Sequence, residues 1–97
     1  MSITVLLDLK AQPGSMDALK QLFVEVLPDT RKYDGCEGLD VRLNQDDGDN
    51  LLLIERWQSR KQYEKYFAWR QETGLLDRLG PLLGAPPSLR YLEDTGI

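Results

Sequence analysis

The segment Leu51–Trp57, LLLIERW, restricts the fold of this chain more than any other feature. Its first four residues are all apolar. Because successive side chains of a strand point to opposite faces of the sheet, a strand built from them is hydrophobic on both faces. A strand with one face in water would alternate apolar and polar residues instead. The segment therefore predicts a strand that is covered on both sides.

Charged and aromatic residues follow this apolar run directly. Glu55 and Arg56 end it, Trp57 comes next, and a helical pattern begins after Ser59. A charge in a buried strand is costly unless it is paired. One face of the helix is expected to carry large side chains inward: Tyr63, Tyr66, Phe67 and Arg70. Together the strand and the helix predict a lined pocket between them.

Apolar periodicity divides the 97 residues into six main segments, which suits a single domain over residues 1–97. Residues 3–10, 39–44, 51–57 and 88–93 read as strands. Helical spacing begins after an N-cap at Ser15, continues towards Pro28, and recurs after Ser59. The order strand, helix, strand, strand, helix, strand predicts an α+β fold of the ferredoxin-like βαββαβ type, with both helices on one face of a four-stranded antiparallel sheet.

The second face of that sheet is also expected to be hydrophobic. Leu6, Leu52, Ile54 and Leu92, or their counterparts on the other face, supply apolar side chains there. A large exposed apolar surface usually marks an interaction site. We therefore expect a homodimer in which two sheets face each other across a two-fold axis.

Composition excludes several classes of protein. The net charge of −4 argues against a nucleic-acid binder, which would need a basic surface. No apolar run approaches the roughly 20 residues that span a bilayer, and Asp8 lies too early for a signal peptide, so we expect a cytoplasmic protein without a membrane partner. A single cysteine, Cys36, and no histidine leave neither a disulfide nor the usual ligands of a transition metal. No metal or cofactor is expected.

Three short motifs resemble the antibiotic biosynthesis monooxygenase domain family. They are the strand end Ile54-Glu55-Arg56-Trp57 before an aromatic helix, the turn Asp34-Gly35-Cys36-Glu37-Gly38-Leu39, and Pro13-Gly14 before the first helix. The resemblance implies a dimeric α+β barrel, in agreement with the dimer expected above. Some members of that family oxidise polycyclic phenols to quinones by oxygen without a cofactor, others degrade haem, and many have no assigned reaction. The family often has a histidine near the position of Tyr66, and its absence here argues against haem chemistry, which needs an axial ligand.

Two readings of the strand-end residues remain open from the sequence. Trp57 either donates its indole N–H to a substrate oxygen or is a core residue. Glu55 either accepts a substrate proton or forms an ion pair with an arginine of a neighbouring strand, such as Arg42 or Arg90, and the ion pair is the favoured reading. A bond from Glu55 across the dimer interface is a third reading.

The helix residues also have two readings. Tyr63, Tyr66 and Phe67 either bound a flat aromatic substrate, with Tyr66 holding or relaying a proton, or simply fill the core. Arg70 and Arg90 either bind a phenolate or carboxylate or are solvated charges. Trp69 lies off the inward face and is expected at a rim or a dimer contact.

The first functional hypothesis is a small cofactor-independent monooxygenase acting on an aromatic, phenolic or quinone-like compound. The substrate would lose a proton and the resulting anion would reduce oxygen, with Trp57, Tyr66 and Arg70 as the leading site residues and Glu55 as the base. One alternative is a non-catalytic dimeric module that binds a small ligand. Another is an isomerase or lyase acting on a cyclic polyketide or lactone, which needs an acid and a base but no oxygen.

Overall fold

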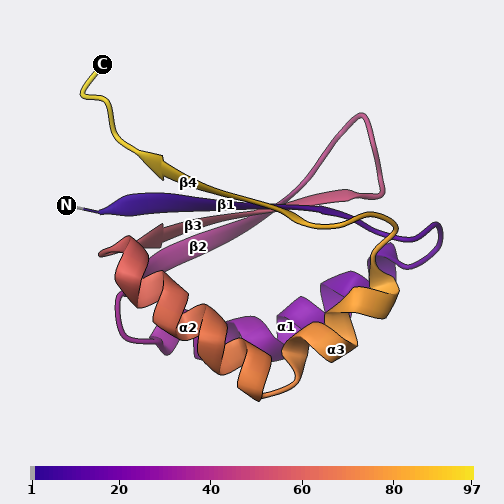
Figure 1. Cartoon of the computed structure of the whole chain (residues 1–97). Coiled ribbons are helices and arrows are strands. Elements are labelled where there is room, and N and C mark those ends of the chain that lie inside the picture. Colours follow the sequence, from indigo (N-terminus) through magenta and orange to yellow (C-terminus); the bar gives the residue numbers. More distant parts are fainter. Residues whose placement is uncertain (1) are drawn as a thin grey trace.

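The computed structural model describes residues 2–97 and contains the four strands and two long helices in the predicted order, with a further short helix before the last strand. The elements are β1 (Ile3–Lys10), α1 (Met16–Lys32), β2 (Cys36–Leu43), β3 (Asn50–Trp57), α2 (Arg60–Glu72), α3 (Leu75–Leu79), a 3₁₀ turn (Gly80–Leu82) and β4 (Ser88–Glu93). The strands form one antiparallel sheet in the order β2-β3-β1-β4. All helices lie on one side of it (Figure 1), which confirms the α+β ferredoxin-like prediction.

Two interleaved crossovers produce this arrangement. The connection β1–α1–β2 leaves room between its two strands, and β3 fills it. The connection β3–α2–β4 leaves a similar gap, which β1 fills. Because crossovers of this type share one hand, α1 and α2 come to lie side by side on the same face. The helices therefore pack against the face of the sheet whose centre is formed by β1 and β3 (Figure 1).

The two faces of the sheet differ as the sequence predicts. Val5, Leu9, Leu51, Leu53 and Trp57 point toward the helices and are buried. On the opposite face Leu6 lies beside Ile54 across the β1–β3 pair, with Leu52 and Leu92 nearby. Ile54 and Leu92 are 40% and 44% exposed, so a hydrophobic centre remains open on this face.

The predictions for the starts of the two long helices have different outcomes. The Ser59 hydroxyl accepts a hydrogen bond from the backbone N–H of Gln62, which confirms it as an N-cap. Ser15 occupies the predicted N-cap position of α1, but its side chain makes no capping hydrogen bond. Pro28 lies inside α1, and the helix continues to Lys32. Proline has no backbone N–H, so Pro28 cannot donate a hydrogen bond to the carbonyl group four residues earlier. Because Pro28 is exposed, that carbonyl group lies on the solvent side of the helix.

The turn between α1 and β2 packs closely against α2. Gly35 has φ +94°, and a Cβ atom there would lie 2.7 Å from the Gln62 side chain, so only glycine fits. Its carbonyl oxygen accepts a hydrogen bond of 2.8 Å from the N–H of Gln58. The strand β2 begins at Cys36, earlier than the alternation from Leu39 predicts. A one-residue bulge between Cys36 and Gly38 separates this first part from the regular pairing with β3.

The interior has two parts. The larger is mainly aliphatic and lies between the sheet, α1 and α3. The smaller, which we call the aromatic cluster, lies under α2 and comprises Tyr33, Trp57, Tyr63, Tyr66, Phe67, Trp69 and Tyr91. Its neighbouring rings have centroids between 5.0 and 6.3 Å apart. None of the helices in residues 2–97 is long and apolar enough to cross a membrane.

Candidate active site

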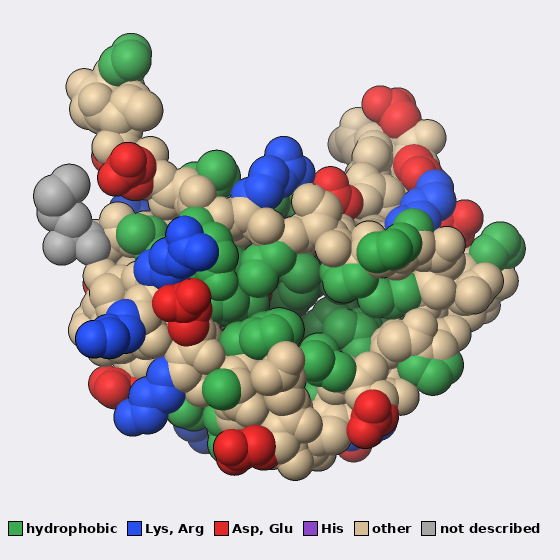
Figure 2. Space-filling model, viewed as in Figure 1, with side chains coloured by type: hydrophobic (Ala, Val, Ile, Leu, Met, Phe, Trp, Pro, Cys, Tyr) green, Lys and Arg blue, Asp and Glu red, His purple; other side chains and the backbone are tan. Residues whose placement is uncertain are grey.

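A cavity of about 280 Å³ lies between the sheet and the three helices. Its mouth is visible as a hollow surrounded by hydrophobic side chains in Figure 2. Most of the lining is aliphatic, and the polar exceptions are Glu55, Tyr63, Tyr66 and Arg70. A concave, mainly apolar space with a few converging polar groups is typical of a small-molecule site.

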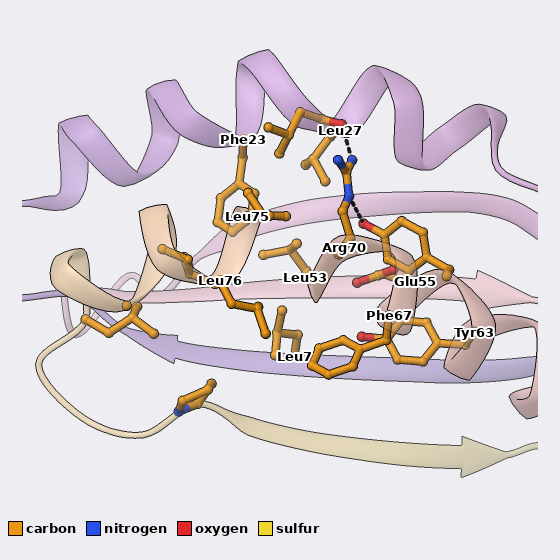
Figure 3. A pocket seen from close by; sticks show the side chains of 16 residues that line it. Leu7, Phe23, Leu27, Leu53, Glu55, Tyr63, Phe67, Arg70, Leu75 and Leu76 are labelled. Atoms are coloured by element: carbon orange, nitrogen blue, oxygen red, sulfur yellow. Dashed lines mark hydrogen bonds between the residues drawn. The ribbon is translucent and has the colours of Figure 1, made fainter. Parts of the chain in front are cut away.

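Glu55 is the acidic group of this cavity. It lies on the helix-facing side of β3, is only 3% exposed, and its carboxyl group points into the pocket (Figure 3). Its Oε1 atom accepts a hydrogen bond of 3.0 Å from the indole Nε1 of Trp57. Burial raises the pKa of Glu55 to about 7, although the bond from Trp57 acts in the opposite direction. The carboxyl group can therefore take up and release a proton near neutral pH.

The favoured prediction of an ion pair between Glu55 and Arg42 or Arg90 is wrong. Arg42 pairs with Asp40 at 3.6 Å, and Arg90 pairs with Asp8 at 3.5 Å. Both arginines lie on the open face of the sheet, because Arg42 is in register with Leu52 and Arg90 with Leu6. The structure therefore does not bring Arg90 to the cavity that contains the other predicted site residues.

Trp57 lies behind the cavity wall. Its side chain is completely buried and does not line the cavity. The rings of Tyr33, Tyr63 and Tyr66 pack around it, and its N–H group is bonded to Glu55. The structure thus places Trp57 beside Glu55 rather than beside the space for a ligand.

Arg70 belongs to a hydrogen-bond network that joins α2 to α1. It is 6% exposed, and its Nη2 atom donates to the carbonyl oxygen of Val26 at 2.7 Å and to Oγ1 of Thr30 at 2.9 Å. Its Nε atom donates to the hydroxyl oxygen of Tyr66 at 3.0 Å (Figure 3). The Thr30 and Tyr66 hydroxyls also share a bond of 2.7 Å. Arg70 is therefore a buried cation with neutral partners, not a solvated charge.

The two tyrosines of the cavity remain neutral in this setting. Burial raises the pKa of Tyr66, while its bonds to Thr30 and Arg70 act in the opposite direction. Burial also raises the pKa of Tyr63, which forms a stacked pair with Phe67. Trp69 lies away from the cavity, stacked on Tyr33 with centroids 5.2 Å apart. The structure thus brings together Glu55, Tyr63, Tyr66, Phe67 and Arg70 as cavity residues.

Sequence reasoning missed one wall of the cavity. That wall comes from α3 and the segment before β4, with Leu75, Leu76, Leu79, Leu83 and Pro87. The sequence holds a signal for it, because residues 75–83, LLDRLGPLL, are rich in leucine around a Gly80-Pro81 break. Thr30 and Val26 were also missed as partners of Arg70.

This arrangement is suited to proton transfer in a mainly apolar cavity. A carboxyl group with a pKa near neutrality is suited to act as a general base or acid. Aliphatic walls exclude water and strengthen electrostatic interactions inside. Within residues 2–97 no group of three or more His, Cys, Asp or Glu side chains is arranged to hold a metal ion.

Comparisons with solved structures agree with this fold. The chain is similar to Rv0793 from Mycobacterium tuberculosis, with 26% identity and a TM-score of 0.85 over 97% of this chain and 95% of that one. A conserved protein from Methanosarcina mazei Go1 has 15% identity and a TM-score of 0.89, with 98% and 94% of the chains covered. A crystal structure of an antibiotic biosynthesis monooxygenase has 19% identity and a TM-score of 0.85, with 96% and 98% covered. The two structures with 15% and 19% identity show that this chain shares their fold.

Comparison with protein families is more specific. No curated protein matches the sequence. Residues 2–74, however, match the model of the family described as antibiotic biosynthesis monooxygenase. The matched segment runs from β1 through α2 and includes Glu55, Trp57, Tyr66 and Arg70. The chain therefore belongs to the antibiotic biosynthesis monooxygenase family.

Proposed function

We propose that this protein is a cofactor-independent monooxygenase that acts on a phenolic or quinone-like aromatic compound. The observation that carries the proposal is the carboxyl group of Glu55, which points into a mainly apolar cavity and has a pKa of about 7. A base of this strength suits a weakly acidic substrate. Family membership supports the oxygen-dependent part of the proposal.

In the proposed reaction Glu55 removes a proton from a ring hydroxyl or from an activated carbon of the bound substrate. The resulting anion is rich in electrons and reduces molecular oxygen directly. One oxygen atom becomes a new carbonyl group, and the other leaves as water with the two hydrogens that the substrate loses. The substrate supplies all the electrons, so the step needs no further reductant. The protein contributes the base and the exclusion of water.

Oxygen uptake with a panel of hydroquinones and anthrones tests this proposal. With the anthrones we expect consumption of one oxygen molecule per quinone formed, with one atom of label from ¹⁸O₂ in the product and the other in water. A hydroquinone that merely loses two hydrogens to oxygen would give an unlabelled quinone and hydrogen peroxide, so label in the product separates a monooxygenase from an oxidase. Glu55→Gln should reduce the rate about a hundredfold or more, as expected for loss of a general base. Glu93→Gln is the matched control, because Glu93 is exposed on β4 and should leave the rate unchanged. Absence of uptake across the panel would contradict the proposal.

A second candidate rests on the same carboxyl group. Proton transfer by Glu55 would also support isomerisation or lyase chemistry on a cyclic polyketide or lactone, which needs no oxygen. An anaerobic arm of the experiment separates the two, since turnover of such substrates would continue without oxygen. A non-catalytic ligand-binding role would instead give binding without turnover, and Glu55→Gln would then retain the ligand.

We also propose that two copies of the chain associate through the open face of the sheet. The hydrophobic centre of that face, formed by Leu6, Leu52, Ile54 and Leu92, supports the proposal. Burial of such a surface against an identical one would remove it from water.

A further inference from the structure

We propose that Trp57 is a positioning residue that acts on the cavity through Glu55 and not by touching a ligand. Its indole N–H binds one oxygen of the carboxyl group and leaves the other oxygen for a bound molecule. The inference rests on the proposed role of Glu55 as the proton acceptor. It assigns Trp57 a function that differs from both readings that the sequence leaves open, direct contact with a substrate and a passive core residue.

The geometry of β3 places the two side chains together. Residues i and i+2 of a strand point to the same face, so Trp57 lies next to Glu55 on the helix-facing side. The indole Nε1 is 3.0 Å from Oε1 of Glu55. The described residues offer no second hydrogen bond to this carboxyl group, so Oε2 is the oxygen that remains for a ligand.

The position of Trp57 excludes a direct role at the ligand. Its side chain has no exposed surface and does not line the cavity. Tyr63 contacts the indole edge-to-face with centroids 5.4 Å apart, and Tyr66 is tilted against it at 5.0 Å. These rings fix the orientation of the indole, which therefore presents its N–H to Glu55 in one direction.

This hydrogen bond also biases the protonation of Glu55. An indole N–H only donates, and it binds a carboxylate more strongly than a neutral carboxyl group. The other titratable groups around Glu55 are the hydroxyls of Tyr63 and Tyr66 on α2 and the thiol of Cys36 on β2. Burial raises the pKa of each of them, so they stay neutral near pH 7. Arg70, the cation of the cavity, is bonded to α1. Trp57 is thus the group that favours the charged form of Glu55.

The indole resonances of the full chain without ligand provide the first test. The Nε1–H signal of Trp57 should move with pH and have a midpoint near the pKa of Glu55, about 7. Trp69 is an internal control, because its N–H makes no hydrogen bond to a carboxylate within residues 2–97, and its signal should not follow that titration. In Glu55→Gln the amide oxygen can still accept the bond, so the Trp57 signal should stay in place and lose its pH dependence.

The second test removes the N–H group. In Trp57→Phe the carboxyl carbon resonance of Glu55 should titrate about one pH unit or more higher, since a hydrogen bond to the charged form has been lost. Trp69→Phe should leave that midpoint unchanged. A Trp57 signal that does not titrate, or an unchanged Glu55 midpoint in Trp57→Phe, would overturn the proposal. Should Trp57→Phe fail to fold, the comparison of wild type with Glu55→Gln still decides it. Neither test uses a substrate, so an absence of oxygen uptake would not affect the result.

Discussion

The Nε atom of Arg70 donates a hydrogen bond to the hydroxyl oxygen of Tyr66, which lies one turn earlier on α2 and 3.0 Å away. The same guanidinium group reaches across to Val26 and Thr30 on α1. Its planar set of donors suits several acceptors at once. The Arg70 side chain thereby links α1 and α2, two of the helices that line the cavity.

We expect Tyr66→Phe to destabilise the protein through this network. The substitution keeps the ring but leaves the buried Nε of Arg70 without its acceptor and removes one of the two hydrogen bonds of the Thr30 hydroxyl, which retains the bond from Nη2 of Arg70. An unsatisfied buried polar group costs about 1–3 kcal/mol. Urea unfolding should show a loss of that size. Tyr63→Phe is the matched control, because the Tyr63 hydroxyl makes no hydrogen bond within residues 2–97 and its loss should change stability little. Equal effects of the two substitutions would contradict this account.

The arrangement of elements was largely predictable from the sequence. Alternation in β1, the continuous apolar run that opens β3 and helical spacing in α1 are local patterns, and they directly indicate where strands and helices form. The N-cap at Ser59 also depends on nearby residues alone. These features need no knowledge of which strands become neighbours, which explains why their prediction is confirmed.

The partners of the site residues depend on distant contacts and were not predictable in the same way. Leu51–Ile54 is apolar on both faces, so the sequence does not indicate which face carries Glu55. The register with β2 and β4 decides it, and places Arg42 and Arg90 on the opposite face. The bonds from Arg70 to Val26 and Thr30 likewise join residues 44 and 40 positions apart.

The pH dependence of stability should reveal the buried carboxyl group. The pKa of Glu55 rises from 4.5 to about 7 on folding, so the folded state binds the proton more tightly than the unfolded state. The free energy of unfolding should therefore fall as the pH rises through this window, by up to about 3 kcal/mol from this group. Above the folded pKa this contribution should not change further.

Glu55→Gln isolates this effect because it removes the titration while preserving the shape of the side chain. Urea unfolding across the same pH range should show the variant gaining stability relative to the wild type as the pH rises. Glu93→Gln, at an exposed site, should follow the wild type. A wild type and a Glu55→Gln variant with the same pH profile would contradict the raised pKa.

Filling the cavity should weaken ligand binding without unfolding the protein. Leu7 is half-buried on β1 and lines the cavity next to Leu53, its cross-strand partner on β3. In Leu7→Trp the indole would occupy space that a ligand needs. We expect the dissociation constant of 1-naphthol, a small aromatic weak acid, to rise at least about tenfold, equivalent to about 1.4 kcal/mol. Isothermal titration can measure this.

A control for this substitution is available on α1. Val24 is 68% exposed and does not line the cavity, so Val24→Trp adds the same group elsewhere and should leave binding unchanged. Unaltered affinity in Leu7→Trp, with its folding intact, would mean that 1-naphthol binds outside this cavity.

Association through the open sheet face should be visible in the mass of the protein in solution. At micromolar concentration we expect the mass of two chains, because the exposed side chains of Ile54 and Leu92 would otherwise remain in water. Ile54→Lys places a charge in the centre of this face and should shift the mass to one chain, since burial of an unpaired charge is strongly unfavourable. Val24→Lys, which alters an exposed apolar residue on α1, should retain the mass of two chains. A wild type with the mass of one chain would refute this association. A dimer that persists in Ile54→Lys would locate the contact on another surface, because the two central strands carry Ile54 and Leu6 side by side in the middle of this face.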